Sequence, residues 1–177
     1  MSKFVVALIV TILSGCASVP LGTMLEFRSF TKDDFINLQP QNLRARVHID
    51  EPARADIEKA ELALELNTEK GLRIFNFPLE LIDELKIEPV SGLFSRSPGK
   101  TEYTLKLSEE AIDNFRATQQ IIRNEQSGRL SFSVKTGFEQ LPSDITEIRL
   151  SIFLKLSEDK GFVTLINNAK LEIKHDG

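Results

Sequence analysis

Apolar and polar residues alternate with a period of two in several short runs along the chain. Residues 43–49 alternate apolar with basic side chains, and residues 130–135 and 148–152 alternate in the same way. This period is typical of a strand with one buried and one solvated face. We therefore predict strands at these three places.

The run at 60–66 is ambiguous. Leu62, Leu64 and Leu66 would share one face of a strand, but the residue types favour helix, and a helix over 53–66 is the competing interpretation. We favour a strand because a turn at 67–71 leads into a second apolar run at 72–77, which predicts a hairpin. Pro78 is expected to end it.

Two further hairpins are predicted. Residues 84–95 and 101–107 flank Ser97-Pro98-Gly99-Lys100, and Pro followed by Gly is typical of a type II turn. Residues 148–152 and 163–173 flank a turn at 158–161.

Two helices are predicted from their start signals. Ser108, followed by two acidic residues, is expected to cap a long helix over about 108–126. Thr31, also followed by acidic residues, predicts a short helix near 32–38. The expected fold is thus mainly β: a single domain over 23–177, built as an antiparallel β-sandwich of about nine strands with the long helix inserted.

The N-terminal segment has a different character. After the basic Lys3, residues 4–13 hold no charge, and the small residues Ser14 and Gly15 follow. This order is that of a secretory signal peptide. The apolar stretch is too short to span a membrane, which takes about 20 residues.

The tetrad Leu13-Ser14-Gly15-Cys16 resembles the lipobox of bacterial lipoproteins. The resemblance implies that residues 1–15 are a cleaved signal peptide, that Cys16 carries a diacylglycerol thioether, and that its new amino group carries a further acyl chain such as palmitate. Residues 16–22 then form a short tether. Ala17 follows the cysteine where an Asp would favour the inner membrane, so the resemblance implies the outer membrane. The competing interpretation is an ordinary signal peptide with an incidental cysteine.

Composition narrows the classes of partner. The chain of 177 residues has 22 basic and 26 acidic side chains, a net charge of −4. This balance argues against a nucleic-acid partner and against broad attraction to anionic lipid. Cys16 is the one cysteine in the sequence, so the predicted domain has no disulfide.

The sequence indicates no cofactor or metal site. Gly99-Lys100-Thr101 resembles the end of a P-loop, but Phe94 stands where that motif requires Gly. The two histidines, His48 and His175, have no metal-ligand spacing.

Arg44 and Arg46, beside His48, could form a basic patch that contacts lipid phosphates or an acidic partner. The alternative, which we favour, is cross-strand pairing with Glu61 and Glu65 on the next strand in sequence.

Leu93, Phe94 and Arg96 lie near the predicted tip of the second hairpin. If exposed, these side chains could contact lipid or a protein partner. In any strand, however, one of two successive side chains points inward, so packing alone explains part of this pattern.

We expect a lipid-anchored cell-envelope protein, held at the outer membrane and facing the periplasm, which acts as a non-catalytic interaction or assembly module for an envelope protein partner. One alternative is a carrier of lipid or another hydrophobic ligand. Another is a secretion-system-associated lipoprotein, because the small lipoprotein of type VI secretion is similar in expected architecture. A third is a hydrolase, which a pocket of titratable groups including His48 would favour.

Overall fold

The computed structural model describes residues 30–91, 96–125, 128–139 and 141–173. Cys16 with its tetrad and tether, and the strand expected at 23–27, lie outside the described residues. The helices are α2 (Lys32–Ile36), the 3₁₀ turn η1 (Pro40–Asn42) and α3 (Glu109–Arg123). The strands are β1 (Arg44–Asp50), β2 (Ala55–Thr68), β3 (Gly71–Ile87), β4 (Val90–Ser91), β5 (Arg96–Ser97), β6 (Lys100–Leu107), β7 (Arg129–Phe138), β8 (Glu147–Lys155) and β9 (Val163–Glu172).

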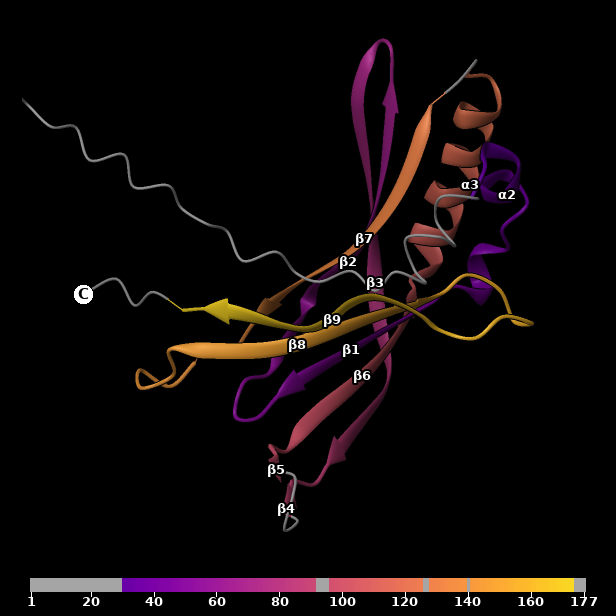
Figure 1. Cartoon of the computed structure of the whole chain (residues 1–177). Helices are drawn as coiled ribbons and strands as arrows, with labels where there is room; N and C mark the ends of the chain where they lie inside the picture. The colour runs from indigo at the N-terminus through magenta and orange to yellow at the C-terminus, as the bar shows by residue number, and fades with distance from the viewer. Residues whose placement is uncertain (1–29, 92–95, 126–127, 140, 174–177) are drawn as a thin grey trace, which may run out of the picture.

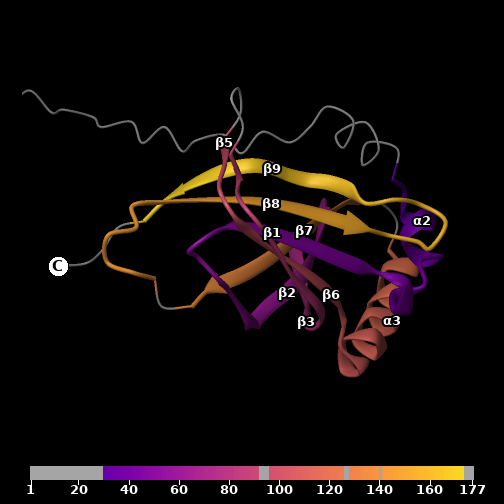
Figure 2. The ribbon, with the colours of Figure 1, turned by 90° about the horizontal axis from the view of Figure 1, so that it is seen from below.

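The structure confirms the expected mainly β, antiparallel fold. Seven strands form one sheet in the order β7-β2-β3-β6-β1-β8-β9, and β4 and β5 form a small hairpin of their own (Figure 1). The long helix is inserted between β6 and β7, as predicted. In both views the two helices lie side by side near one end of the sheet (Figures 1 and 2).

Strand β3 connects the two parts of this sheet. Its first half pairs with β2 as far as Pro78, opposite Glu61, and its second half pairs with β6 from Leu79, opposite Leu107. The prediction that Pro78 ends the strand is wrong. Proline has no N–H to donate, but Pro78 lies where β3 exchanges one partner for the other, so it interrupts neither ladder. Its carbonyl still accepts a hydrogen bond from the Ser108 N–H at 3.2 Å.

The first hairpin is confirmed. Residues 60–66 belong to β2 and not to a helix, with Leu62, Leu64 and Leu66 all buried. Thr68 pairs with Gly71, so Glu69 and Lys70 form a two-residue turn. Gly71 has φ +116°, a conformation that glycine adopts without steric cost.

The turn of the second hairpin differs from the prediction. Strands β3 and β6 pair from Ile87 and Lys100 inward, as expected. Beyond them, however, β4 pairs with β5, so Pro98 and Gly99 join β5 to β6 and do not form the tip. The Gly99 carbonyl instead accepts a hydrogen bond from the Glu51 N–H at 2.8 Å, which ties this joint to the end of β1.

Both helix starts follow the sequence signals. Thr31 and Asp34 form a capping box at α2, and the Ser108 hydroxyl accepts a hydrogen bond from the Ala111 N–H at 3.1 Å. The first helix is shorter than expected because Asn37 already forms its C-cap. The second ends at Arg123, three residues before the expected end.

Aromatic rings join the helices to the sheet. The Phe115 ring of α3 lies 5.1 Å from that of Phe35 in α2 and 5.0 Å from that of Phe77 in β3, measured between centroids. All three side chains are almost completely buried. In the part of the chain that the structure describes, no helix has the length and apolar character needed to cross a membrane.

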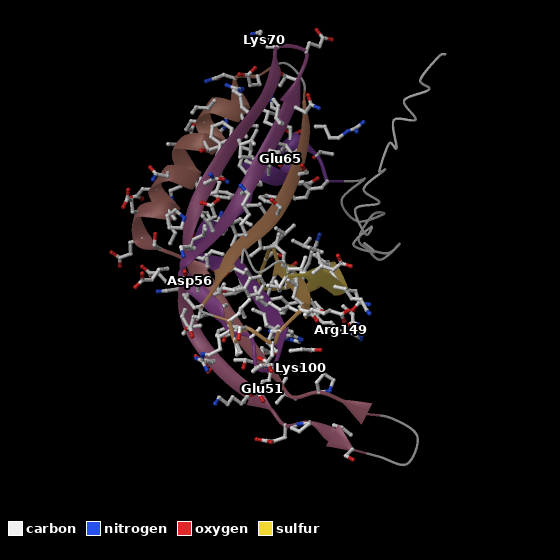
Figure 3. The ribbon with its side chains drawn as sticks, turned by 90° about the vertical axis from the view of Figure 1, so that its left-hand side faces the viewer. Glu51, Asp56, Glu65, Lys70, Lys100 and Arg149 are labelled. Carbon is white, nitrogen blue, oxygen red and sulfur yellow. The ribbon has the colours of Figure 1, made fainter. Side chains whose placement is uncertain are left out.

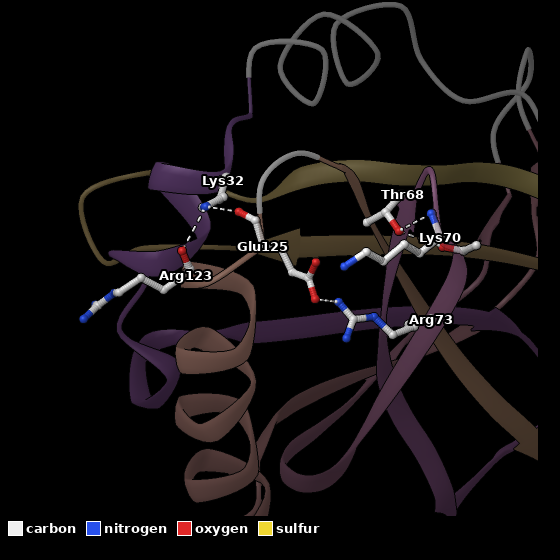
Figure 4. Close-up of polar contacts among 7 residues, drawn as sticks. Lys32, Thr68, Lys70, Arg73, Arg123 and Glu125 are labelled. Carbon is white, nitrogen blue, oxygen red and sulfur yellow. Dashed lines mark hydrogen bonds and ion pairs between the residues drawn. The ribbon is translucent and has the colours of Figure 1, made fainter.

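Polar contacts join the C-terminal end of α3 to α2 and to β3 (Figure 4). The Lys32 ammonium donates hydrogen bonds to the carbonyl oxygens of Arg123 at 3.0 Å and Glu125 at 2.5 Å. Glu125 in turn pairs with Arg73 of β3. These bonds fix α2, the end of α3 and the β2–β3 hairpin relative to one another.

Candidate functional site

The outward face of β6, β1 and β8 is basic, although the chain as a whole is acidic. Alternate residues of these strands are buried, and the residues between them point outward. This face carries six cations and three acids, Asp50, Glu102 and Glu147. Its net charge is therefore +3, whereas the net charge of the whole chain is −4. The six are Arg44, Arg46, Lys100, Lys106, Arg149 and Lys155.

Arg44 occupies the middle of a basic row. Its register partners are Lys106 on β6 and Lys155 on β8. Its guanidinium donates hydrogen bonds to the backbone carbonyls of Gln41 and Leu43, both at 2.7 Å. Part of its charge is therefore directed at the chain itself and not at solvent.

Arg46 and His48 share one carboxylate. Arg46 Nε lies 3.1 Å from Glu102 Oε1, and His48 Nε2 lies 2.6 Å from Glu102 Oε2. The Arg46 guanidinium also lies over the Phe162 ring, 4.1 Å from its centroid. The His48 ring lies 4.8 Å from that of Phe153. These contacts hold both basic side chains against the sheet.

The predicted pairing of Arg44 and Arg46 with Glu61 and Glu65 is wrong. Strand β1 lies between β6 and β8, not beside β2, so neither glutamate is its neighbour. Glu61 instead forms an ion pair with Lys135 of β7, with 3.4 Å between Glu61 Oε1 and Lys135 Nζ.

Burial lowers the pKa of His48 below its ordinary value, although the hydrogen bond and charge of Glu102 act in the opposite direction. The imidazole is therefore neutral near pH 7. It is a weakly basic, largely covered group, with 19% of its side chain exposed.

A polar cleft of about 340 Å³ opens beside His48. Lys100 and Arg149, which border it, come from β6 and β8 at the same end of the sheet (Figure 3). Burial raises the pKa of Asp50, while the positive charges of Lys100 and Arg149 oppose that rise. The cleft is lined by His48, Asp50, Pro98, Lys100, Arg149, Leu150, Ser151, Asn167 and Asn168.

A β-bulge shapes one wall of the cleft. Leu150 pairs with Ala169 and Ile152 pairs with Ile166, so Asn167 and Asn168 together oppose the single residue Ser151. Asn168 has φ +48°, and its N–H donates a hydrogen bond to Ser151 Oγ at 2.9 Å. Bulges re-aim side chains in this way. The Asn-Asn pair, whose residue type tolerates this conformation, was the one sequence signal for it.

The cleft also brings a histidine and a serine together. Glu102, His48 and Ser151 occupy one row across β6, β1 and β8. His48 Nε2 is bonded to Glu102, however, and Ser151 Oγ accepts the Asn168 N–H. Among the described residues, no hydrogen bond joins His48 to Ser151, so the row lacks the nucleophile-to-base contact of a serine hydrolase.

The second half of β3 presents a different kind of surface. Over Leu79–Ile87 it pairs with β6, and β2 has already left its other edge, so the described strands leave that edge unpaired. Four apolar side chains are exposed along this stretch and just beyond it, by 39% to 57%. They are Leu81, Ile82, Leu85 and Val90.

The structure describes only part of the predicted hairpin tip. Leu93 and Phe94 are not among the described residues, and Arg96 is described by its backbone in β5 alone. Within the described ranges, no three His, Cys, Asp or Glu side chains come together as a metal site. Comparison with protein-family models, with curated proteins and with solved structures finds no match for this chain.

Proposed function

We propose that the protein is a lipid-anchored, non-catalytic interaction module of the bacterial cell envelope, held at the outer membrane through Cys16. The membrane part of this proposal rests on the likeness of Leu13-Ser14-Gly15-Cys16 to a lipobox. The interaction part rests on the unpaired edge of β3 between Leu79 and Ile87.

The exposed apolar side chains carry the argument. An edge strand is normally protected by charges, and this one does hold acidic residues and a lysine. Yet Leu81, Ile82 and Leu85 remain 39%, 47% and 52% exposed on the same stretch. A partner that added a strand here would satisfy the open backbone groups and cover these side chains.

Charge defines the partner further. The segment from Leu79 to Val90 holds four acids and one lysine, a net charge of −3. Two of the acids are already paired, Glu84 with Arg54 at 2.8 Å and Glu80 with Lys106 at 3.7 Å, so the free charge of this segment lies on Asp83 and Glu88. We therefore expect an extended segment of an envelope protein that alternates apolar with basic side chains. The acids of β3 and the residues just after it are Glu80, Asp83, Glu84 and Glu88.

The carrier alternative gains no support from the aromatic residues. The rings that would line a ligand cavity pack against one another, as Phe35 does with both Phe115 and Phe132. The hydrolase alternative would need the bond between His48 and Ser151 that the geometry does not supply. The interaction module is therefore the function that the described surface supports best.

Site-specific photo-crosslinking in intact cells tests the docking edge. A photoreactive residue at Leu85 should capture one defined envelope protein, and the same residue at Ala117, exposed on α3, should not. Leu85→Arg should abolish the captured complex by repelling a basic partner, whereas Leu85→Ile should retain it. Equal capture at both positions, or capture of bulk lipid alone, would contradict the proposal.

The anchor is tested separately. Cys16→Ala should move the protein from the membrane fraction to the soluble fraction and remove its acyl chains, as measured by mass spectrometry. Unchanged membrane partitioning would refute the lipoprotein interpretation without affecting the docking edge.

A further inference from the structure

The polar cleft contains opposite charges that the protein does not pair with each other. Asp50 and Lys100 are direct register partners on β1 and β6. Side chains at such positions usually meet. Within the described residues, however, neither makes an ion pair within 4.0 Å, so each faces the cleft without a partner of opposite sign.

A second cation of the cleft, Arg149, is held in place by an ion pair. Arg149 Nε lies 3.0 Å from Glu147 Oε1, and Glu147 is bonded in turn to Lys170 at 3.2 Å. The β-bulge places Asn167 and Asn168 in the lining of the cleft. The cleft is therefore lined by one carboxylate, two cations and two amides.

We propose that this cleft binds a small zwitterion, a molecule that carries an ammonium and a carboxylate on neighbouring atoms as a free α-amino acid does. Asp50 receives the ammonium, and Lys100 and Arg149 receive the carboxylate. The bulge amides of Asn167 and Asn168 bond the remaining polar atoms. This activity is separate from partner docking at β3 and does not depend on it.

Charge selects the zwitterion over simpler ligands. A phosphate or a simple carboxylate would satisfy the cations but leave the Asp50 carboxylate desolvated beside a second anion. A simple amine would satisfy Asp50 and leave the Lys100 ammonium unmatched. A neutral sugar would cover all three charges without pairing any. A molecule with both charges compensates each group, and a volume of about 340 Å³ restricts it to a small one.

Asp50 should also limit the stability of the ligand-free protein. Burial raises the pKa of this carboxyl, although the charges of Lys100 and Arg149 act in the opposite direction. Asp50→Asn should therefore leave the melting temperature of the free protein unchanged or higher while removing the ammonium site. A binding site that costs stability when it is empty is typical of functional positions.

Calorimetric titration of the purified full-length protein in detergent tests the proposal. The probes are glycine and the standard L-amino acids, one at a time, with acetate, ethylamine, inorganic phosphate and glucose as probes that lack one or both charges. At least one amino acid should bind saturably and raise the melting temperature. The other four probes should do neither.

Variants identify the site. Asp50→Asn and Arg149→Gln should each weaken binding by about tenfold or more, and Asn168→Gly should weaken it less while preserving the backbone conformation. Lys86→Gln, an exposed change on β3, should leave binding unchanged.

Three results would overturn the proposal: no saturable binding by any amino acid, phosphate binding as tight as that of the best amino acid, or unchanged affinity in Asp50→Asn. The melting temperature of each free variant separates lost binding from lost folding. None of these outcomes bears on crosslinking at Leu85, so this proposal and the docking edge fail independently.

Discussion

The side chain of Gln119, on α3, is hydrogen-bonded to backbone carbonyls at the end of α2. Its Nε2 lies 2.9 Å from the Phe35 carbonyl oxygen, 3.2 Å from that of Ile36 and 2.9 Å from that of Leu38. The side chain is 6% exposed. These acceptors lie at the end of α2, where helix carbonyls lack partners within the helix. Gln119 therefore acts as a cap supplied from α3.

The contribution of Gln119 to the free energy of unfolding follows from this geometry. An amide NH₂ has two N–H groups, so it forms two full bonds and shares the third acceptor. Each bond contributes about 0.5–1.5 kcal/mol net. Phe35 keeps a second donor, the Leu38 N–H at 3.2 Å. Gln119→Met keeps the side-chain length but removes both donors, so we expect a loss of about 2 kcal/mol.

Urea denaturation followed by circular dichroism measures this loss. A change of about 2 kcal/mol corresponds to about 4–8 °C in melting temperature for a domain of this size. The matched control is Gln120→Met, the same substitution at the adjacent, exposed position of α3. Equal stability of the two variants, at unchanged urea m-value, would refute the capping role.

Gln119→Glu provides a second test, through pH. A carboxylate facing carbonyl oxygens is disfavoured, so its folded-state pKa lies above the unfolded value of about 4.3. The stability gained by protonation is therefore fully present below that unfolded value and is lost as pH rises through the raised folded pKa. The deficit of this variant should grow from pH 4 to pH 7, while that of Gln119→Met should not.

Two further predictions concern the stability of variants at His48 and Lys32. Because burial lowers the pKa of His48, the unfolded chain binds a proton more readily than the folded one. Stability should fall as pH drops below about 6.5, and His48→Gln should flatten this slope in thermal melts across pH 5–8. Lys32→Met removes the bonds to the carbonyls at the end of α3. It should lower the melting temperature by about 2–4 °C, against no change for the exposed Lys70→Met.

Local signals in the sequence predicted much of the fold. The caps at Thr31 and Ser108 depend on residues within one helical turn, so the sequence contains all the information needed. The strand at 60–66 was predicted against its helical residue types because its neighbour in the hairpin is close in sequence. Alternation predicted which face of β1 is buried.

The predictions that failed for the sheet and the site concern pairing between distant segments. Nothing near Pro78 indicates that β3 leaves β2 for β6, because the second partner lies on the far side of the β4–β5 hairpin in the chain. The partner of Arg46 is Glu102, and choosing it over Glu61 requires the strand order. The cleft assembles Asp50, Lys100 and Arg149 from three strands for the same reason.

The continuity of β3 couples the unfolding of the two parts of the sheet. One unbroken strand supplies hydrogen bonds to β2 before Pro78 and to β6 after it. Neither part of the sheet can separate without disturbing the backbone on which the other part depends. The amides that β3 donates to β2 and to β6 should therefore exchange slowly with a common opening free energy, and the chain should behave as one cooperative unit.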